Sequence, residues 1–257
     1  MRGSAWRAPE MRMEKANDCS YFSWSNIALS NGSSMTTLTT PPVAALLERL
    51  FAEAEAASAA LAPAFAGMSA AERAALLSSK TEYRALYGRM KDVPLAVSPE
   101  TGRLLYMLAR AAGARQIVEF GTSFGISTLH LAAALRDNGG GRLIGSEFEP
   151  SKVARARANI AAAGLSELVE IREGDALQTL ARDLPAEIDL VLLDGAKGLY
   201  PEVLALLQDR LRPGALIVAD NADWSPEYLA QVRSPAAGYL SVPFAEEIEL
   251  SMRLPKE

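Results

Sequence analysis

The sequence predicts an α/β fold in which helices alternate with the strands of a mostly parallel sheet. The first observation is a series of five short apolar runs separated by segments of helical periodicity, at 116–120, 142–147, 168–172, 188–193 and 215–219. Such alternation is typical of parallel βαβ units, whose central strands are buried on both faces. The second observation is a pair of strand-like runs, 239–244 and 248–254, joined by a short acidic turn. This pair predicts an antiparallel hairpin at the edge of the sheet.

The helices are predicted from apolar spacing and from their first residues. An apolar stripe beginning at Val43 predicts a helix to about Leu61, and the capping box at 69–72 predicts a second helix that a break at Pro94 follows. An N-cap at 98–100 opens the next helix. Later helices are expected between the strands, at 126–135, 150–163 (with proline in its first turn), 176–181 and 200–210. The turn 212–214, Arg-Pro-Gly, opens the fifth strand.

Composition limits the classes of function. The 257 residues are 49% hydrophobic and carry a formal net charge of −5, without the basic stripe that nucleic-acid binding requires. The single cysteine, Cys19, excludes an intramolecular disulfide, and the single histidine, His130, excludes a histidine-rich zinc site. No apolar run is long enough to span a bilayer, and the first residues lack a secretory signal. We therefore expect a cytoplasmic protein with neither nucleic-acid nor membrane partners.

The same features suggest three parts of the chain. Residues 1–34 show no sustained period and are expected to be a flexible leader. Residues 35–95 predict an N-terminal helical cover, which can act as a lid or a dimer surface, and residues 96–257 predict the α/β core.

A glycine turn follows the first strand and opens the next helix. Its spacing is G-x-x-x-G, from Gly121 to Gly125, and Glu119 stands two residues before the first glycine. Glycines let the backbone approach a ligand, and the helix N-terminus presents free N–H groups. The acid would repel the diphosphate of a dinucleotide, so we expect a zwitterionic amino-acid group with its ammonium toward Glu119 and its carboxylate toward the helix amides and Ser127.

Two further acids extend this site along the sheet. Glu147 ends the second strand, where a carboxylate can accept hydrogen bonds from both hydroxyls of a ribose. Asp175 and Ala176 follow the third strand and can contact an adenine edge, and the alternative for Asp175 taken alone is that it merely caps a helix. An amino acid, a ribose and an adenine across three adjacent strand ends describe S-adenosylmethionine.

A cluster of oxygen-bearing side chains follows the fourth and fifth strands. Asp194 and Lys197 follow one strand, and Asp220 and Asn221 end the other. Two carboxylates and an amide oxygen suit Mg²⁺, and Lys197 beside a dication is expected to have a lowered pKa and to accept a proton. Each residue alone also has a structural interpretation, as a turn residue, a cap or a solvated lysine.

These motifs resemble the cation-dependent class I O-methyltransferases, the group that contains catechol and caffeoyl-CoA O-methyltransferases. The resemblance runs from about residue 98 to 254 and rests on the motifs V-E-F-G-T-S-F-G-I-S-T, S-E-F-E-P, G-D-A, L-L-D-G-A-K-G-L-Y and R-P-G-A-L-I-V-A-D-N. It implies a Rossmann-like sheet of seven strands with the last antiparallel. It also implies a homodimer.

The resemblance implies roles for individual residues. Asp194, Asp220 and Asn221 are the expected metal ligands, and Lys197 with Asp194 forms the expected catalytic pair. The expected contacts to S-adenosylmethionine are Val97, Glu119, Gly121, Ser123, Gly125, Ser127, Glu147, Asp175, Ala176 and Asp194.

The chain departs from the family at 195 and 196, where Gly195 and Ala196 are small, and it has no evident match to the aromatic gatekeepers of the animal catechol enzyme. Trp224 and Tyr228 are expected either to line the acceptor site or simply to pack inside the protein. His130 and Tyr200 are expected to be packing residues.

The predicted reaction is methyl transfer from S-adenosylmethionine to a small aromatic hydroxyl with a neighbouring hydroxyl, assisted by Mg²⁺ or another divalent cation. The alternatives are a metal-independent methyltransferase acting on another oxygen or nitrogen, and a non-catalytic S-adenosylmethionine-binding module. An NAD-linked oxidoreductase is disfavoured by the glycine spacing.

Overall fold

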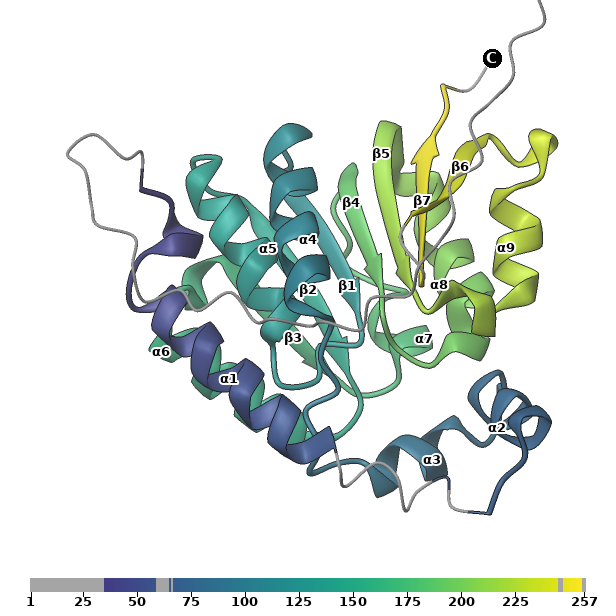
Figure 1. Cartoon of the computed structure of the whole chain (residues 1–257). Helices are drawn as coiled ribbons and strands as arrows, with labels where there is room; N and C mark the ends of the chain where they lie inside the picture. Colours follow the sequence, from purple (N-terminus) through teal and green to yellow (C-terminus); the bar gives the residue numbers. More distant parts are fainter. Residues whose placement is uncertain (1–34, 59–64, 66, 245–246, 256–257) are drawn as a thin grey trace, which may run out of the picture. The chain divides into compact units, whose positions relative to one another are not determined.

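The computed structural model describes residues 35–58, 65, 67–244 and 247–255. The predicted leader 1–34, with Cys19, lies outside the described residues. In the described part, a seven-stranded sheet has the order β3-β2-β1-β4-β5-β7-β6 (Figure 1). The strands are β1 (Gln116–Phe120), β2 (Arg142–Glu147), β3 (Val169–Glu173), β4 (Ile188–Leu193), β5 (Leu211–Asp220), β6 (Tyr239–Phe244) and β7 (Ile248–Arg253).

The strand directions confirm the predicted sheet. The pairs β1–β2, β1–β4, β2–β3 and β4–β5 are parallel, whereas β7 is antiparallel to both β5 and β6. The hairpin therefore adds β7 between β5 and the edge strand β6. Because β1–β5 all run in the same direction, their carboxyl ends meet at one edge, where ligands bind in open α/β sheets.

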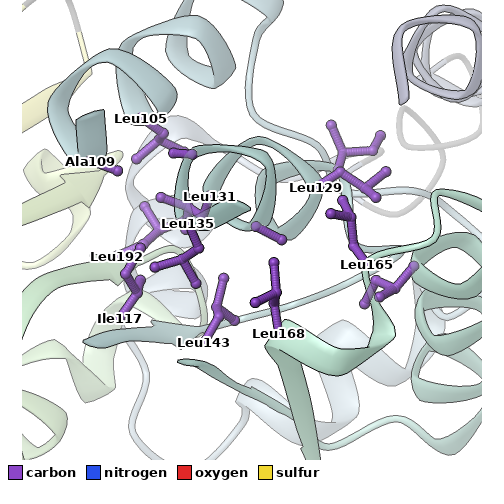
Figure 2. Packing of buried hydrophobic residues seen from close by; sticks show 14 of the residues in the cluster. Leu105, Ala109, Ile117, Leu129, Leu131, Leu135, Leu143, Leu165, Leu168 and Leu192 are labelled. Carbon is purple, nitrogen blue, oxygen red and sulfur yellow. The ribbon is translucent and has the colours of Figure 1, made fainter. Parts of the chain in front are cut away.

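Alternation along each strand sends successive side chains into two cores. Ile117 faces the core beneath α1, α4, α5 and α6, whereas Val118 faces the core beneath α7, α8 and α9. Figure 2 shows the first core, where labelled side chains from α4, α5 and strands β1, β2 and β4 meet. The helices are α1 (Val43–Ser58), α2 (Ala70–Leu77), α3 (Tyr83–Arg89), α4 (Pro99–Ala111), α5 (Ile126–Asp137), α6 (Pro150–Ala162), α7 (Ala176–Thr179), α8 (Tyr200–Leu207) and α9 (Pro226–Val232).

The segment before the sheet differs from its prediction. The capping box at Ser69 and Glu72 is present, but the chain forms two helices, α2 and α3, before Pro94. Between them the hydroxyl of Ser79 accepts the backbone N–H groups of Thr81 and Glu82, at 3.3 and 3.0 Å. Such local hydrogen bonds compete with helical ones and explain the break. The predicted end of α1 near Leu61 lies outside the described residues.

The start of the fifth strand also differs. The predicted turn 212–214 lies within β5, where the register shifts between the pairs Ile188–Leu211 and Leu190–Leu216. Pro213 lacks an N–H group and Gly214 has a φ of +81°, so the extra residues form an irregularity in the strand.

No helix of the described chain is long and apolar enough to cross a membrane.

Candidate active site

The glycine turn brings the ends of β1 and β4 into backbone contact. Gly121 has a φ of +97°, and a Cβ at this position would lie 2.5 Å from the carbonyl oxygen of Asp194. The N–H of Asp194 donates to the carbonyl oxygen of Phe120 at 2.8 Å. Only glycine satisfies both the left-handed backbone and the close approach. A Cβ at Gly195 would lie 2.5 Å from the Phe120 ring, which explains why this position is small.

The Glu119 side chain stabilises the glycine turn through hydrogen bonds. Its side chain is buried, and its carboxylate accepts hydrogen bonds from the hydroxyls of Ser127 and Thr128, each at 2.6 Å, and of Thr122 at 3.0 Å. Burial raises the pKa of Glu119 to about 7, although the three hydroxyls oppose this shift. Both carboxylate oxygens are therefore already used inside the protein.

A first cavity, here called the turn cavity, opens beside the glycine turn at the carboxyl ends of β1, β2 and β3. Six of the predicted cofactor residues line it, namely Gly121, Ser123, Glu147, Asp175, Ala176 and Asp194. The other four, Val97, Glu119, Gly125 and Ser127, are not among its lining residues. Of these, Gly125 precedes α5 as its N-cap and Val97 is buried just before α4.

The two acids expected to meet ribose and adenine are both held in place. The backbone N–H groups of Ser123 and Glu149 donate to the Glu147 carboxylate at 2.8 and 3.0 Å. Asp175 accepts the N–H of Leu177 at 2.9 Å, which makes it the cap of α7, and it pairs with Arg84 of α3 at 2.6 Å. The capping interpretation of Asp175 is therefore confirmed, and the residue lines the cavity as well.

A second cavity, here called the aspartate cavity, has a volume of about 440 Å³ and lies at the ends of β4 and β5. It shares Tyr87, Leu95 and Asp194 with the turn cavity. Ten of its fifteen lining residues are apolar or aromatic, and the other five are charged or carry an amide. The lining consists of Ala54, Phe65, Leu77, Tyr87, Met90, Val93, Pro94, Leu95, Ala96, Asp194, Lys197, Asp220, Asn221, Trp224 and Glu247.

Lys197 lies between the two predicted metal-binding carboxylates. Its Nζ is 2.9 Å from Oδ1 of Asp194 and 3.7 Å from Oδ2 of Asp220. Burial lowers the pKa of Lys197, but Asp194, Tyr200 and Asp220 outweigh it, and the net pKa lies well above the usual value. The predicted lowering assumed a neighbouring dication; with the two carboxylates alone, Lys197 is an ammonium ion.

The carboxylate of Asp220 and the amide of Asn221 are both constrained. Burial and then the nearby charge of Asp194 raise the pKa of Asp220 to about 7, while Lys197 opposes the shift. Asn221 has a φ of +47°, and its Nδ2 donates to Oε2 of Glu247 at 3.0 Å. This bond engages the amide nitrogen and leaves the amide oxygen as the group that can ligate a cation.

The donor set fits a hard divalent cation in its chemistry. Two carboxylates and an amide oxygen are ligands that Mg²⁺ prefers, and one lysine does not balance Asp194, Asp220 and Glu247. Within the described residues, however, no group of three or more His, Cys, Asp and Glu side chains is arranged to hold a metal ion.

Comparison with known proteins decides the family. Residues 69–254 match the family model described as O-methyltransferase. The chain belongs to this O-methyltransferase family. The match includes every predicted site residue.

Two curated members of the O-methyltransferase family are similar over part of the chain. A protein named catechol O-methyltransferase from Niastella koreensis is 41% identical over 130 residues, which cover 49% of this chain and 58% of that protein. A protein of the same name from Mycobacterium tuberculosis is 36% identical over 127 residues, covering 49% of this chain and 57% of that protein. The chain thus spans little more than half the length of the curated relatives it matches.

Solved structures of the family agree over more of the chain. Cofactor-bound Rv0187 from MTB has a TM-score of 0.57 and 27% identity, and covers 76% of this chain and 94% of that one. TomG from Streptomyces achromogenes, an O-methyltransferase of tomaymycin synthesis in complex with S-adenosylmethionine, has a TM-score of 0.54 and 28% identity, and covers 78% and 96%. Both share the Rossmann-like O-methyltransferase fold.

The structure distinguishes between the two roles expected for Trp224 and Tyr228, namely lining the acceptor site and packing. Trp224 lines the aspartate cavity, whereas Tyr228 is fully buried and packs edge-on against Tyr200 with the ring centroids 5.7 Å apart. The Tyr200 hydroxyl lies 2.8 Å from the carbonyl oxygens of both Leu193 and Asp220, so it ties the ends of β4 and β5 together. His130 is buried with Nδ1 2.8 Å from the carbonyl oxygen of Ile126, which confirms its packing role.

Several residues that line the cavities were not predicted from the sequence to belong to the site. Tyr83 and Tyr87 come from α3, and Leu95 from the segment after it, so they reach the site from outside the matching motifs. Phe148 and Lys152 stand shortly after Glu147, within or next to a quoted motif. That proximity to Glu147 was the one local signal that could have identified them.

Proposed function

We propose that this protein is an S-adenosylmethionine-dependent O-methyltransferase that methylates a small catechol-like diol with the help of a divalent cation. The observation that carries the proposal is the junction of the two cavities at Asp194. This residue lines both the turn cavity, which we assign to the cofactor, and the aspartate cavity, which we assign to the acceptor. Methyl transfer needs donor and acceptor to meet at one point, and positioning is a large part of its catalysis.

The turn cavity is proposed to hold S-adenosylmethionine. Glu147, whose carboxylate accepts two backbone N–H groups, would also accept hydrogen bonds from the ribose hydroxyls. Phe148 and Ala176, which line the same cavity, would supply apolar surface for the adenine ring. The solved TomG complex contains S-adenosylmethionine, which supports this cofactor.

The aspartate cavity is proposed to hold the acceptor, with its ring against apolar walls and its hydroxyls toward Asp194, Asp220 and Asn221. These three residues would hold the divalent cation. When bound there, the cation would stabilise the ionised hydroxyl and offset the carboxylate charge that keeps the pKa of Lys197 high. The name catechol O-methyltransferase, which two relatives carry, supports a diol acceptor.

Lys197 is proposed to receive the proton of the acceptor hydroxyl. In the reaction the oxygen forms a bond to the methyl carbon, the carbon–sulfur bond of the sulfonium breaks, and S-adenosylhomocysteine leaves. The electron pair of the broken bond stays on sulfur. Tyr87 and Leu95, which line both cavities, would help to exclude water from this point.

The proposal is tested with a panel of catechols, caffeoyl esters and other hydroxylated aromatics, assayed with Mg²⁺ and with EDTA. We expect methylation of vicinal diols and no turnover in EDTA. Turnover that survives EDTA would favour a metal-independent methyltransferase, and tight cofactor binding without methylation of any diol would favour a non-catalytic module. A cytoplasmic location and a homodimer stay predictions.

A further inference from the structure

A buried lysine in the turn cavity has no role in the mechanism above. Lys152, near the start of α6, is 3% exposed. Its Nζ lies 3.4 Å from Oγ of Ser123 and 5.9 Å from the centroid of the Phe124 ring. Among the described residues it forms no salt bridge within 4.0 Å. Burying an ammonium group is costly unless polar partners compensate, so a long contact to one hydroxyl leaves donor capacity unused.

The surroundings of Lys152 suggest what it binds. It is the single lysine or arginine among the described residues that line the turn cavity, where four acids also lie, Glu147, Glu149, Asp175 and Asp194. Glu147 ends β2 five positions earlier in the chain, and both oxygens of its carboxylate already accept a backbone N–H. A carboxylate can accept further hydrogen bonds but cannot donate one.

We propose that Lys152 is a cofactor-binding residue that donates a hydrogen bond to a ribose hydroxyl whose own proton is accepted by Glu147. A hydroxyl carries one donor hydrogen and two acceptor lone pairs, so an acid alone satisfies only half of it. The pair of Glu147 and Lys152 presents an acceptor and a charged donor to the same ribose. The inference rests on the proposed placement of the ribose at Glu147.

The opposing interpretation is that Lys152 only packs over Phe124 and balances the cavity acids. The two interpretations differ in their dependence on ribose chemistry. A structural lysine would affect every adenosine ligand alike, whereas a hydroxyl-binding lysine would affect only ligands that carry the hydroxyl.

The test measures binding of S-adenosylhomocysteine and its 2′-deoxy and 3′-deoxy analogues by calorimetry, which needs no methyl transfer. The variants are Lys152→Met, which keeps the length of the side chain without its donor, and Lys152→Gln, which keeps a neutral donor. Lys91→Met is the matched control, because Lys91 is exposed and lies outside both cavities. Glu147→Gln tests the ribose placement separately.

We expect Lys152→Met to weaken S-adenosylhomocysteine about tenfold or more, as for loss of a hydrogen bond to a charged group. For the deoxy analogue that lacks the relevant hydroxyl, the same substitution should change the affinity less than about twofold. Lys152→Gln should recover part of the difference, and Lys91→Met should match the wild type.

Equal losses for all three ligands in Lys152→Met would overturn the proposal. If that variant is unfolded by circular dichroism, the same comparison is made with Lys152→Gln, and equal affinities of this variant and the wild type for all ligands would overturn it too. If Glu147→Gln also leaves the preference for ribose unchanged, the ribose placement is wrong. If wild-type protein fails to bind S-adenosylhomocysteine at all, the proposed function itself fails.

Discussion

The Nζ atom of Lys197 lies 2.9 Å from Oδ1 of Asp194, just past the end of β4, and the lysine side chain is buried. The same ammonium group lies 3.7 Å from Asp220, so one positive charge serves two carboxylates that follow adjacent strands. The contact joins the residue that borders both cavities to the proposed proton acceptor. A substitution of either residue should therefore alter the place where the methyl donor and the acceptor meet.

Replacing Lys197 should separate catalysis from cofactor binding. Lys197 lines the aspartate cavity but not the turn cavity. We expect Lys197→Met to lower kcat by about 100-fold or more, in line with the loss of a general base, with affinity for S-adenosylhomocysteine within about twofold of wild type. Steady-state kinetics and calorimetry measure the two effects. Because the variant leaves two carboxylates facing each other, Mg²⁺ should raise its Tm more than that of the wild type. Full turnover in this variant would exclude the proposed role.

Replacing Asp220 should impair turnover and cation binding without changing the affinity for the cofactor. It lines the aspartate cavity, whereas Asp194 borders both. We expect Asp220→Asn to reduce turnover by about 100-fold or more and to weaken Mn²⁺ binding, measured by calorimetry, with cofactor affinity unchanged. Glu187→Gln is the matched control, because Glu187 precedes β4 at the opposite end of the strand. A loss of cofactor binding in Asp220→Asn would contradict the assignment of the two cavities.

Glu119 should make stability fall as pH rises. Its pKa is raised by burial to about 7 in the folded protein, so above the unfolded value of 4.5 the native state holds a proton that the unfolded chain has lost. This contribution is complete below pH 4.5 and is lost as pH rises toward 7. Relative to Glu119→Gln, the free energy of unfolding of the wild type should decrease by up to about 1.4 kcal/mol per pH unit in this window. Urea unfolding of both proteins at about pH 5, 6 and 7 tests this; parallel pH profiles would mean that Glu119 stays charged.

Gly121 should be intolerant of any side chain. Gly121→Ala must accept a φ of +97° and a Cβ 2.5 Å from the Asp194 carbonyl oxygen. Gly140→Ala is the matched control, since Gly140 has a φ of +105° but a Cβ added there would meet nothing within 4 Å. Both variants should lose about 1–2 kcal/mol from the backbone conformation. Only Gly121→Ala should also weaken S-adenosylhomocysteine binding, by about tenfold or more, because it displaces the junction of the cavities. Equal cofactor affinities in the two variants would show that the close contact at Asp194 is dispensable.

Much of the fold was predictable because it depends on local patterns. Apolar runs and the caps at Ser69 and Ser98 each specify their element through burial or hydrogen bonds within a few residues. The predictions failed where the residues that interrupt or extend an element give only a weak signal in the sequence. Ser79 divides the expected second helix, and Pro213 and Gly214 lie inside β5 instead of before it.

For the site, the sequence by itself determined which polar side chains follow the strands, since the carboxyl ends of parallel strands share one edge. The tertiary structure decided how these side chains divide between two cavities, that Lys197 contacts Asp194, and that Glu119 is buried behind the turn. It also brought Tyr87 and Glu247 to the aspartate cavity from segments about a hundred residues before and fifty after Asp194 along the chain. Contacts between such distant segments arise from the packing of helices and a hairpin against the sheet, and no local spacing in the sequence encodes them.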